Sequence, residues 1–186
     1  MGIGVNLDVL TNEISGQLSE QGKKDLLEGF RNPKNRIHLA LCREPYIQYM
    51  ISGTKTIESR ITKNKCIPYG KVEKDDLVLL KQTGGPVLAV FSVNKVYSYE
   101  TRFFSLDEIR KTYQKQLCIH DDWWERKKDA GYATLLEIRE IAALKPISLS
   151  LYKNRQSWII LRERVKRIWG SKTLFPFPLF YIVRLT

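Results

Sequence analysis

The chain has 186 residues, 43% of them hydrophobic, which is enough for one substantial domain with a buried core. Its three cysteines are odd in number and far apart, which argues against a disulfide framework and for reduced thiols. No apolar run approaches the ~20 residues that span a bilayer, and the N-terminus lacks the pattern of a secretory signal. We therefore expect a cytoplasmic protein that does not associate with membranes.

The N-terminal part predicts helices. Residues 5–31 carry apolar side chains at helical intervals, interrupted at Gly22, so two short amphipathic helices are expected there. The segment 32–35 has the composition of a turn and makes a natural boundary. This pattern divides the chain into an N-terminal helical extension, 1–34, and a main domain, 35–186.

The first half of the main domain alternates between strands and one helix. Residues 37–41 alternate as in a strand, and Pro45 begins a helix that Gly53 ends. A strand is expected over 54–61. The clearest hairpin joins residues 77–82 to 87–96 through a turn with two glycines, which permit the positive φ angles such turns use.

The second half adds two helices and more strands. Ser105 and Glu108 form a capping box, so 106–117 should be helical, and Asp121 with Asp122 should cap a short helix to residue 130. A long strand is expected over 132–147 and a closing strand over 177–185. Residues 157–169 fit either a helix or a strand. The fold class is therefore α+β, a small mixed β-barrel with inserted helices and an N-terminal helical extension.

The positive charge is concentrated at the C-terminal end. The formal net charge is +11, and residues 146–186 carry eight basic residues against Glu163 alone. A charged surface is often only a solvated one. Here aromatic residues stand among the cations, and cations hold phosphates while aromatic faces stack on bases. This pattern favours nucleic acid as the partner, although the amphipathic basic segment 161–168 is also compatible with an anionic membrane.

The run from Gly53 to Arg60 concentrates charged residues at the start of a predicted strand. Strand alternation places Glu58 and Arg60 on one face and Lys55 on the other, unless a bulge intervenes. An exposed strand with ion pairs two residues apart would give the same pattern without any function.

The order of elements around this run resembles a known family. The pattern Gly53-x-Lys55-x-x-Glu58-x-Arg60 follows a helix with Tyr46 and Met50, and the segment 74–80 and a Gly-Gly hairpin come after it. This arrangement resembles the ASCH domains of the PUA-like superfamily over roughly residues 37–145. The chain has Lys-Asp-Asp at 74–76 where the family usually has Gly-Asp.

The resemblance implies a cleft between barrel and helix that accommodates RNA or a nucleoside. Arg60 could grip a phosphate with two hydrogen bonds, and Lys55 could supply a movable point charge. Glu58 could accept from a base amino group or hold Arg60 in place.

The resemblance also raises an enzymatic alternative. Some small ASCH proteins are amidohydrolases that deacetylate N4-acetylcytidine, with lysine at the position of Lys55 and a threonine nucleophile at the position of Glu58. A carboxylate can act as a general base but cannot replace a hydroxyl nucleophile. These enzymes use an acidic residue in the helical insertion, where this chain offers Asp121, Asp122 or Glu125; acids at a helix N-terminus also need no catalytic role.

Other motifs are weaker. The segment 118–122 contains Cys, His and Asp, but no second cluster has ligand spacing, so no metal and no cofactor are expected. The tryptophans at 123 and 124 precede Glu-Arg-Lys-Lys and could form a stacking and phosphate-binding element. Adjacent positions on a helix point about 100° apart, so at least one of the two should be buried.

Three hypotheses follow for the function. The first is an RNA-binding domain that recognises an RNA or nucleotide-like ligand. The second is a hydrolase of a modified nucleoside or of RNA, in which Lys55 and Glu58 form the acid/base pair. The third is a protein-interaction domain whose N-terminal helices bind a partner. The residues predicted to bind nucleic acid are Lys55, Arg60, Lys81, Arg155, Trp158, Arg162, Arg164, Lys166 and Arg167.

Overall fold

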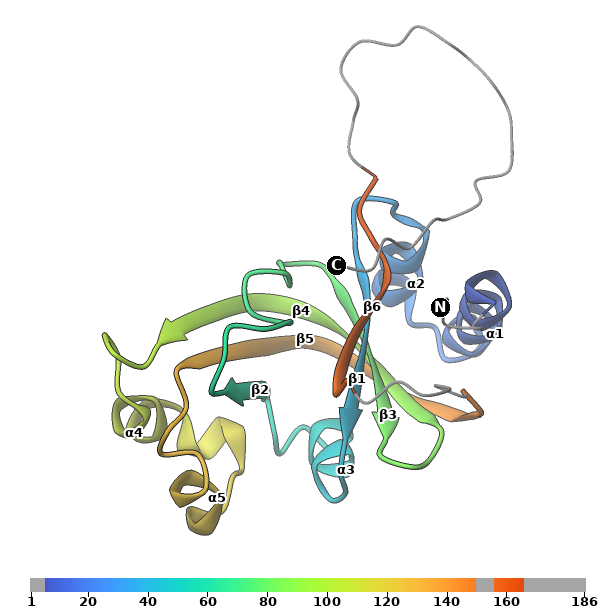
Figure 1. Ribbon diagram of the computed structural model, residues 1–186. Helices are drawn as coiled ribbons and strands as arrows, with labels where there is room; N and C mark the ends of the chain where they lie inside the picture. The colour runs from blue at the N-terminus through green and yellow to red at the C-terminus, as the bar shows by residue number, and fades with distance from the viewer. Residues whose placement is uncertain (1–5, 150–155, 166–186) are drawn as a thin grey trace, which may run out of the picture.

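The computed structural model describes residues 6–149 and 156–165 (Figure 1). Within this part of the chain six strands form one sheet: β1 (Ile37–Cys42), β2 (Ile57–Thr62), β3 (Leu77–Gln82), β4 (Val87–Glu100), β5 (Tyr132–Ile147) and β6 (Trp158–Arg162). Their order across the sheet is β2-β5-β4-β3-β1-β6. β1 and β3 are parallel, and the other neighbours are antiparallel.

The sheet curls into a half-barrel (Figure 1). β4 and β5 are the longest strands, and their pairing contains three irregularities in register between Val87 and Lys95. Bulges of this kind increase local twist and bend a strand. The curl brings the two outer strands of the described sheet, β2 and β6, toward each other across the open side.

Five helices cover the sheet in the described residues: α1 (Leu7–Glu20), α2 (Lys24–Arg31), α3 (Tyr46–Ile51), α4 (Leu106–Leu117) and α5 (Asp121–Glu125). α1 and α2 bury Leu10, Ile14, Leu18, Leu26 and Phe30 against one face of the sheet, so the N-terminal helices share a hydrophobic core with the strands. No helix in the described ranges combines the length and the apolar content needed to cross a membrane.

The other two hydrophobic clusters support the site described below. α3 contributes Ile47 and Met50 to a cluster on the concave side of the sheet, which includes Phe91 of β4 and Trp158 of β6. α4 and α5 pack over the end of the sheet that contains β2 (Figure 1).

Most predicted elements are confirmed. The two N-terminal helices, the first strand, the helix ending before Gly53, the hairpin, the capping box of α4 and the long strand 132–147 are all present. Only Gly84 of the two hairpin glycines has a positive φ, +76°. The ambiguous segment forms a strand at Trp158–Arg162, while the predicted strand 177–185 lies outside the described residues.

Two predicted boundaries are wrong. The strand expected over 54–61 begins only at Ile57, because the amides of Lys55 and Thr56 donate to the carbonyls of Tyr49 in α3 and Gln116 in α4 rather than to a neighbouring strand. The helix expected to reach residue 130 ends at Glu125 and continues as turns. His120 occupies its N-cap, and Asp121 and Asp122 lie in its first turn.

Asp75 adopts a left-handed backbone conformation in the turn before β3, with a φ of +69°. Glycine adopts this left-handed conformation freely, and Asp and Asn tolerate it better than other residues do. Aspartate therefore fits this turn, although the conformation favours glycine.

Candidate functional site

The Gly-x-Lys-x-x-Glu-x-Arg run begins at the end of α3 and continues into β2. Gly53 has a φ of +76°, and the amide of Lys55 donates to the carbonyl of Tyr49 at 2.8 Å. Since β2 starts at Ile57, Lys55 precedes the strand, and the alternation that placed it opposite Glu58 does not apply. Its side chain turns to the same side as that carboxylate.

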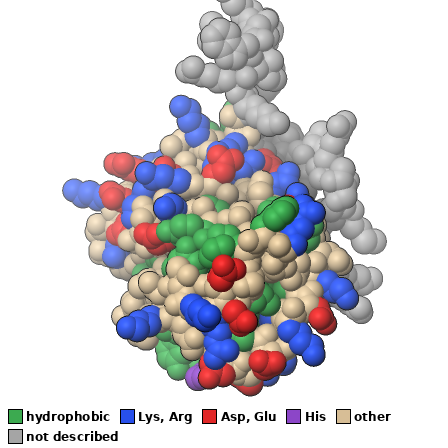
Figure 2. Space-filling view, turned by 90° about the vertical axis from the view of Figure 1, so that its left-hand side faces the viewer, with side chains coloured by type: hydrophobic (Ala, Val, Ile, Leu, Met, Phe, Trp, Pro, Cys, Tyr) green, Lys and Arg blue, Asp and Glu red, His purple; other side chains and the backbone are tan. Residues whose placement is uncertain are grey.

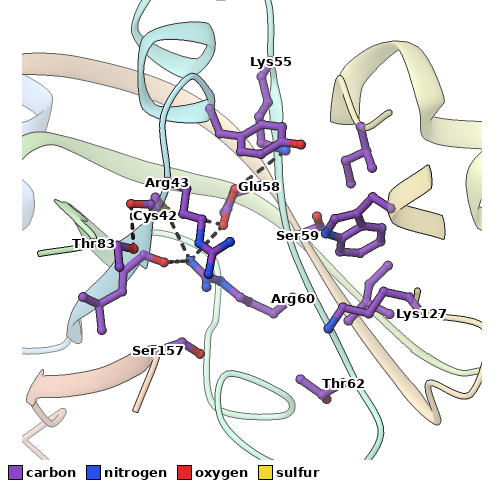
Figure 3. A pocket seen from close by; sticks show the side chains of 15 residues that line it. Cys42, Arg43, Lys55, Glu58, Ser59, Arg60, Thr62, Thr83, Lys127 and Ser157 are labelled. Carbon is purple, nitrogen blue, oxygen red and sulfur yellow. Dashed lines mark hydrogen bonds and ion pairs between the residues drawn. The ribbon is translucent and has the colours of Figure 1, made fainter. Parts of the chain in front are cut away.

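Lys55, Glu58 and Arg60 converge on one point (Figure 3). Lys55 Nζ lies 3.7 Å from Glu58 Oε2, and Arg60 NH2 lies 3.1 Å from Glu58 Oε1. Lys55 Nζ also donates to the carbonyl of Leu117 at 2.9 Å, which ties the segment before β2 to the end of α4. Lys55 is 2% exposed and Glu58 is 5% exposed, so the carboxylate acts as a buried counter-ion for two cations.

Arg60 bridges the open side of the half-barrel. Its NH2 group donates to the carbonyl of Leu41 at 3.0 Å and to Cys42 Sγ at 3.2 Å, both at the end of β1. Its guanidinium carbon lies 5.1 Å from the ring centroid of Trp158 in β6. The Nε atom is buried and has no hydrogen-bond partner within the described part of the chain. Arg60 thus fixes β2 against β1.

The buried groups around Arg60 have altered protonation equilibria. Burial lowers the pKa of Lys55, and the nearby carboxylate of Glu58 only partly offsets this effect. Burial, with a further contribution from Glu58, raises the pKa of Cys42 to about 12. Cys42 is therefore a neutral thiol at physiological pH and not an activated nucleophile.

These residues form one wall of a pocket of about 440 Å³. The pocket lies between β2 and the end of β1, with α3 on one side and the segment around α5 on the other (Figure 3). Its lining contains four cationic side chains and one carboxylate. The lining residues are Leu41, Cys42, Arg43, Tyr46, Lys55, Glu58, Ser59, Arg60, Ile61, Thr62, Thr83, Ile119, Trp123, Lys127 and Ser157.

Arg43 and Lys127 supply the charge that is not already neutralised. Arg43 is exposed, and Lys127 is half-buried with its Nζ 5.6 Å from the ring centroid of Trp123. Neither forms an ion pair with any described residue. Trp124 is only 5% exposed, so of the two adjacent tryptophans one is buried and the other lines the pocket.

The structure brings together only some of the residues predicted to bind nucleic acid. Lys55 and Arg60 line the pocket, while Trp158 is 1% exposed beneath Arg60 and offers no free face to a base. Lys81 is buried at the β3–β4 hairpin, where it donates to the carbonyl of Gly85. Arg162 and Arg164 are bonded within the protein. Arg155, Lys166 and Arg167 lie outside the described ranges.

The arginines of β6 and its continuation are bonded within the fold. Arg162 donates to the carbonyls of Phe30, Asn32 and Asn35 at 2.6, 3.0 and 3.1 Å, which ties β6 to the connection between α2 and β1. Arg164 pairs with Glu73 and with the buried Asp76. In this arrangement both guanidinium groups serve the fold rather than an open basic face.

The acidic residues of the helical insertion lie outside the pocket lining. Asp121 pairs with Arg110 at 2.6 Å and Asp122 with Arg126 at 2.6 Å, and both carboxylates are exposed. Glu125 is exposed as well. No group of three His, Cys, Asp or Glu side chains in the described residues is arranged to hold a metal ion.

Sequence reasoning missed Arg43, Thr83 and Ser157, which reach the pocket from three separate connections. Of these three residues, Arg43 could most easily have been predicted from the sequence. It directly follows the predicted first strand and precedes the helix before Gly53, so it had to lie beside that helix. The other two depend on how the sheet curls.

Comparison with known proteins identifies the fold. No family model matches the sequence, and no curated protein matches it. The structure is similar to that of ASCH from Zymomonas mobilis, with a TM-score of 0.55, 14% identity and coverage of 70% of this chain and 90% of that one. A Ser-to-Ala variant of that protein gives a TM-score of 0.54 at 14% identity over 70% and 91% of the two chains. A Tyr-to-Phe variant gives 0.53 at 15% identity over 68% and 90%. The chain therefore has the fold of an ASCH domain.

Proposed function

We propose that this protein binds single-stranded RNA or a nucleotide-like ligand in the pocket between β1, β2 and α3. The observation that carries the proposal is the charge of the lining, four cations against one carboxylate, with two cations unpaired among the described residues. Concave sites of roughly 300–1,000 Å³ accommodate small ligands, and a pocket of about 440 Å³ falls within that range. A nucleotide combines an anionic group with a flat ring, and the lining suits both.

Each part of a nucleotide has a suitable neighbour in the pocket. Arg43 and Lys127 are available to contact phosphate oxygens, Arg43 with two parallel hydrogen bonds. The rings of Tyr46 and Trp123 are available to stack on a base. Lys55 and Arg60, which already neutralise Glu58, would add a buried positive field to the bottom of the site.

Binding measurements on pocket variants test this proposal. Fluorescence titration with a labelled single-stranded RNA hexanucleotide should give an affinity that falls as salt rises. Arg43→Ala and Lys127→Ala should each weaken it and reduce the logarithmic salt slope by about 0.7. Lys24→Ala, an exposed lysine of α2, is the matched control and should change neither quantity. Wild-type protein that binds no RNA, or pocket variants that bind as well as Lys24→Ala, would exclude the proposal.

A hydrolase is the second candidate, because burial lowers the pKa of a pocket lysine that lies 3.7 Å from a carboxylate. Such a lysine is more easily deprotonated and can take a proton from a nucleophile. Incubation with N4-acetylcytidine and with end-labelled RNA would reveal the activity. Turnover that Lys55→Met abolishes would support it, and equal product from wild type and variant would rule it out.

A further inference from the structure

We propose that single-stranded nucleic acid extends out of the pocket over an adjoining surface, which we call the lysine track: Lys63, Lys65, Tyr69, Lys128 and Tyr132. The proposal rests on the proposed function, because it concerns the part of the same ligand beyond the bound nucleotide. It adds that the ligand is an oligonucleotide and not a free nucleotide.

The track begins at the pocket wall. Thr62 lines the pocket and pairs with Tyr132 across β2 and β5, so the two side chains lie on the same face of the sheet. The ring of Tyr132 lies 5.1 Å, centroid to centroid, from the ring of Tyr69. Lys65 Nζ lies 5.3 Å from the centroid of Tyr69. These contacts make a continuous surface from the pocket to Lys65.

The second side of the track is the loop that follows α5. The amide of Gly131 donates to the carbonyl of Thr62 at 3.0 Å, and a Cβ at Gly131 would lie 2.7 Å from the carbonyl oxygen of Lys63. Residue 131 must therefore be glycine for the two loops to meet. Lys127 of this loop lines the pocket, and the exposed Lys128 follows it. Figure 3 draws Thr62 and Lys127 on the side of Arg60 away from Thr83, which is the side where the track begins.

The lysines of the track have no competing anions bound to them. Within the described part of the chain, Lys63, Lys65 and Lys128 form no ion pair, whereas Arg102, Arg110, Arg126 and Arg139 are all paired. The sequence contains no acidic residue from 59 to 72, and Asp129 is the one acid in the loop 126–131. Figure 2 shows the face of the molecule that lies on the left in Figure 1, where Lys and Arg side chains lie among acidic and hydrophobic ones.

The chemistry of this surface suits an unpaired strand. Lysine ammonium groups contact phosphates, and tyrosine faces stack on bases without regard to sequence. The pairing of Lys65 with Tyr69 repeats that of Lys127 with Trp123 in the pocket, so the cation and the ring recur along one path. A duplex would not fit, because its bases are stacked and paired and none is free to enter the pocket.

The test compares a mononucleotide with a single-stranded hexanucleotide on the full chain. Wild type should bind the hexanucleotide more tightly than the mononucleotide. Lys63→Ala/Lys65→Ala should remove much of that difference, reduce the salt slope for the hexanucleotide by about 1.4, and leave mononucleotide affinity unchanged. Tyr69→Leu, which keeps an apolar contact with Tyr132, should weaken hexanucleotide binding about tenfold.

Controls separate this inference from the proposed function. Lys24→Ala/Lys34→Ala removes as many positive charges as Lys63→Ala/Lys65→Ala does, but from exposed residues of α2 and the following turn. It should change neither the affinity for the hexanucleotide nor its salt slope. Mononucleotide binding without a gain for the hexanucleotide would overturn the track but not the pocket, while no binding of either would overturn both. Comparing the affinities for RNA and DNA hexanucleotides shows which of the two single-stranded nucleic acids the protein prefers. Tighter binding of duplex RNA or of an acidic peptide would also overturn the track.

Discussion

Two groups of buried charges in this protein differ in whether they line the pocket. One is the pocket group of Lys55, Glu58 and Arg60. The other, which we call the Asp76 cluster, consists of His38, Asp76 and Arg164. Both contain a carboxylate held by cationic or polar donors in the interior. The first group lines the pocket described above, and no member of the second is among its lining residues.

In the Asp76 cluster every acceptor position of the carboxylate is occupied. Oδ1 accepts from the amide of Arg36 and from Arg164 NH2, both at 2.9 Å, and Oδ2 accepts from the amide of Glu73 at 2.8 Å. The last donor is His38 Nε2 at 3.2 Å. Trp158 Nε1 donates to His38 Nδ1 at 3.2 Å, so His38 is a neutral imidazole with its proton on Nε2.

The comparison shows that buried charge alone does not identify a binding site. The bonds to the Asp76 carboxylate stabilise the turn before β3, and the bond between His38 and Trp158 holds Trp158 in position. The pocket group lines the pocket and lies beside Arg43 and Lys127, which form no ion pair with any described residue. Substitutions in the Asp76 cluster should therefore lower the stability of the fold, whereas substitutions in and beside the pocket group should weaken RNA binding.

The largest expected effect is the loss of stability in Asp76→Asn. Replacing the carboxylate removes the counter-ion of Arg164 in the interior and should lower the free energy of unfolding by about 3 to 5 kcal/mol. Urea denaturation followed by tryptophan fluorescence would measure it. RNA affinity of the folded protein should stay within about twofold of wild type. A stable variant with lost binding would reverse the roles assigned to the two groups.

A smaller effect is expected for Arg164→Ala. The loss of charge-assisted hydrogen bonds to Asp76 and Glu73 should cost about 2 kcal/mol of stability. Because this guanidinium is already bonded, RNA affinity should not change. Arg43→Ala is the matched comparison and should show the opposite pattern, with unchanged stability and weaker binding. Weaker RNA binding by Arg164→Ala would contradict this expectation and would support the prediction from the sequence that Arg164 binds nucleic acid.

The Asp76 cluster should also make stability depend on acid pH. Burial by itself would raise the pKa of Asp76, but hydrogen bonds from His38, Arg164 and the amides of Glu73 and Arg36 lower it below 3.8. The unfolded chain therefore binds the proton first, and this contribution is present above pH 3.8 and lost as pH falls toward the pKa of the folded state. The difference in unfolding free energy between wild type and Asp76→Asn should narrow by about 1.4 kcal/mol per pH unit there. A constant difference from pH 5 to pH 3 would contradict the assignment.

The smallest expected effect on stability is that of Lys55→Met. Burial already disfavours the charged ammonium, and Glu58 keeps Arg60 as its counter-ion, so replacing Lys55 by an apolar side chain of similar length should change stability by less than about 1 kcal/mol at pH 7. RNA affinity should nevertheless fall.

The pH dependence of stability in wild type and in Lys55→Met tests whether the buried ammonium of Lys55 is unfavourable. The penalty on the wild-type ammonium is complete below the lowered pKa of Lys55 and disappears as pH rises to the ordinary lysine value of 10.5. Stability measured from pH 7 to pH 10.5 should therefore rise for wild type relative to the variant. Lys115→Met on the exposed side of α4 is the control and should show no such change.

Local signals in the sequence were sufficient for most elements. Apolar residues at helical spacing determined α1 and α2, the capping box determined the start of α4, and a glycine ended the helix before Lys55. These signals involve residues a few positions apart and act through backbone geometry, so no knowledge of distant contacts is needed. The same reasoning left the segment that contains Trp158–Arg162 undecided between helix and strand, because a short apolar run fits both periods.

The composition of the site was visible in the sequence, but its geometry depended on tertiary structure. The run from Gly53 to Arg60 contained the charges, and the sequence alone determined that a lysine, a carboxylate and an arginine would lie close together along the chain. The fold decided that Lys55 precedes β2 and so faces Glu58, and that Arg60 closes the gap to β1. It also decided that Arg162 and Arg164 are bonded to residues about 90 to 130 positions earlier. Whether a cation is free for a ligand depends on neighbours that only the curled sheet brings together.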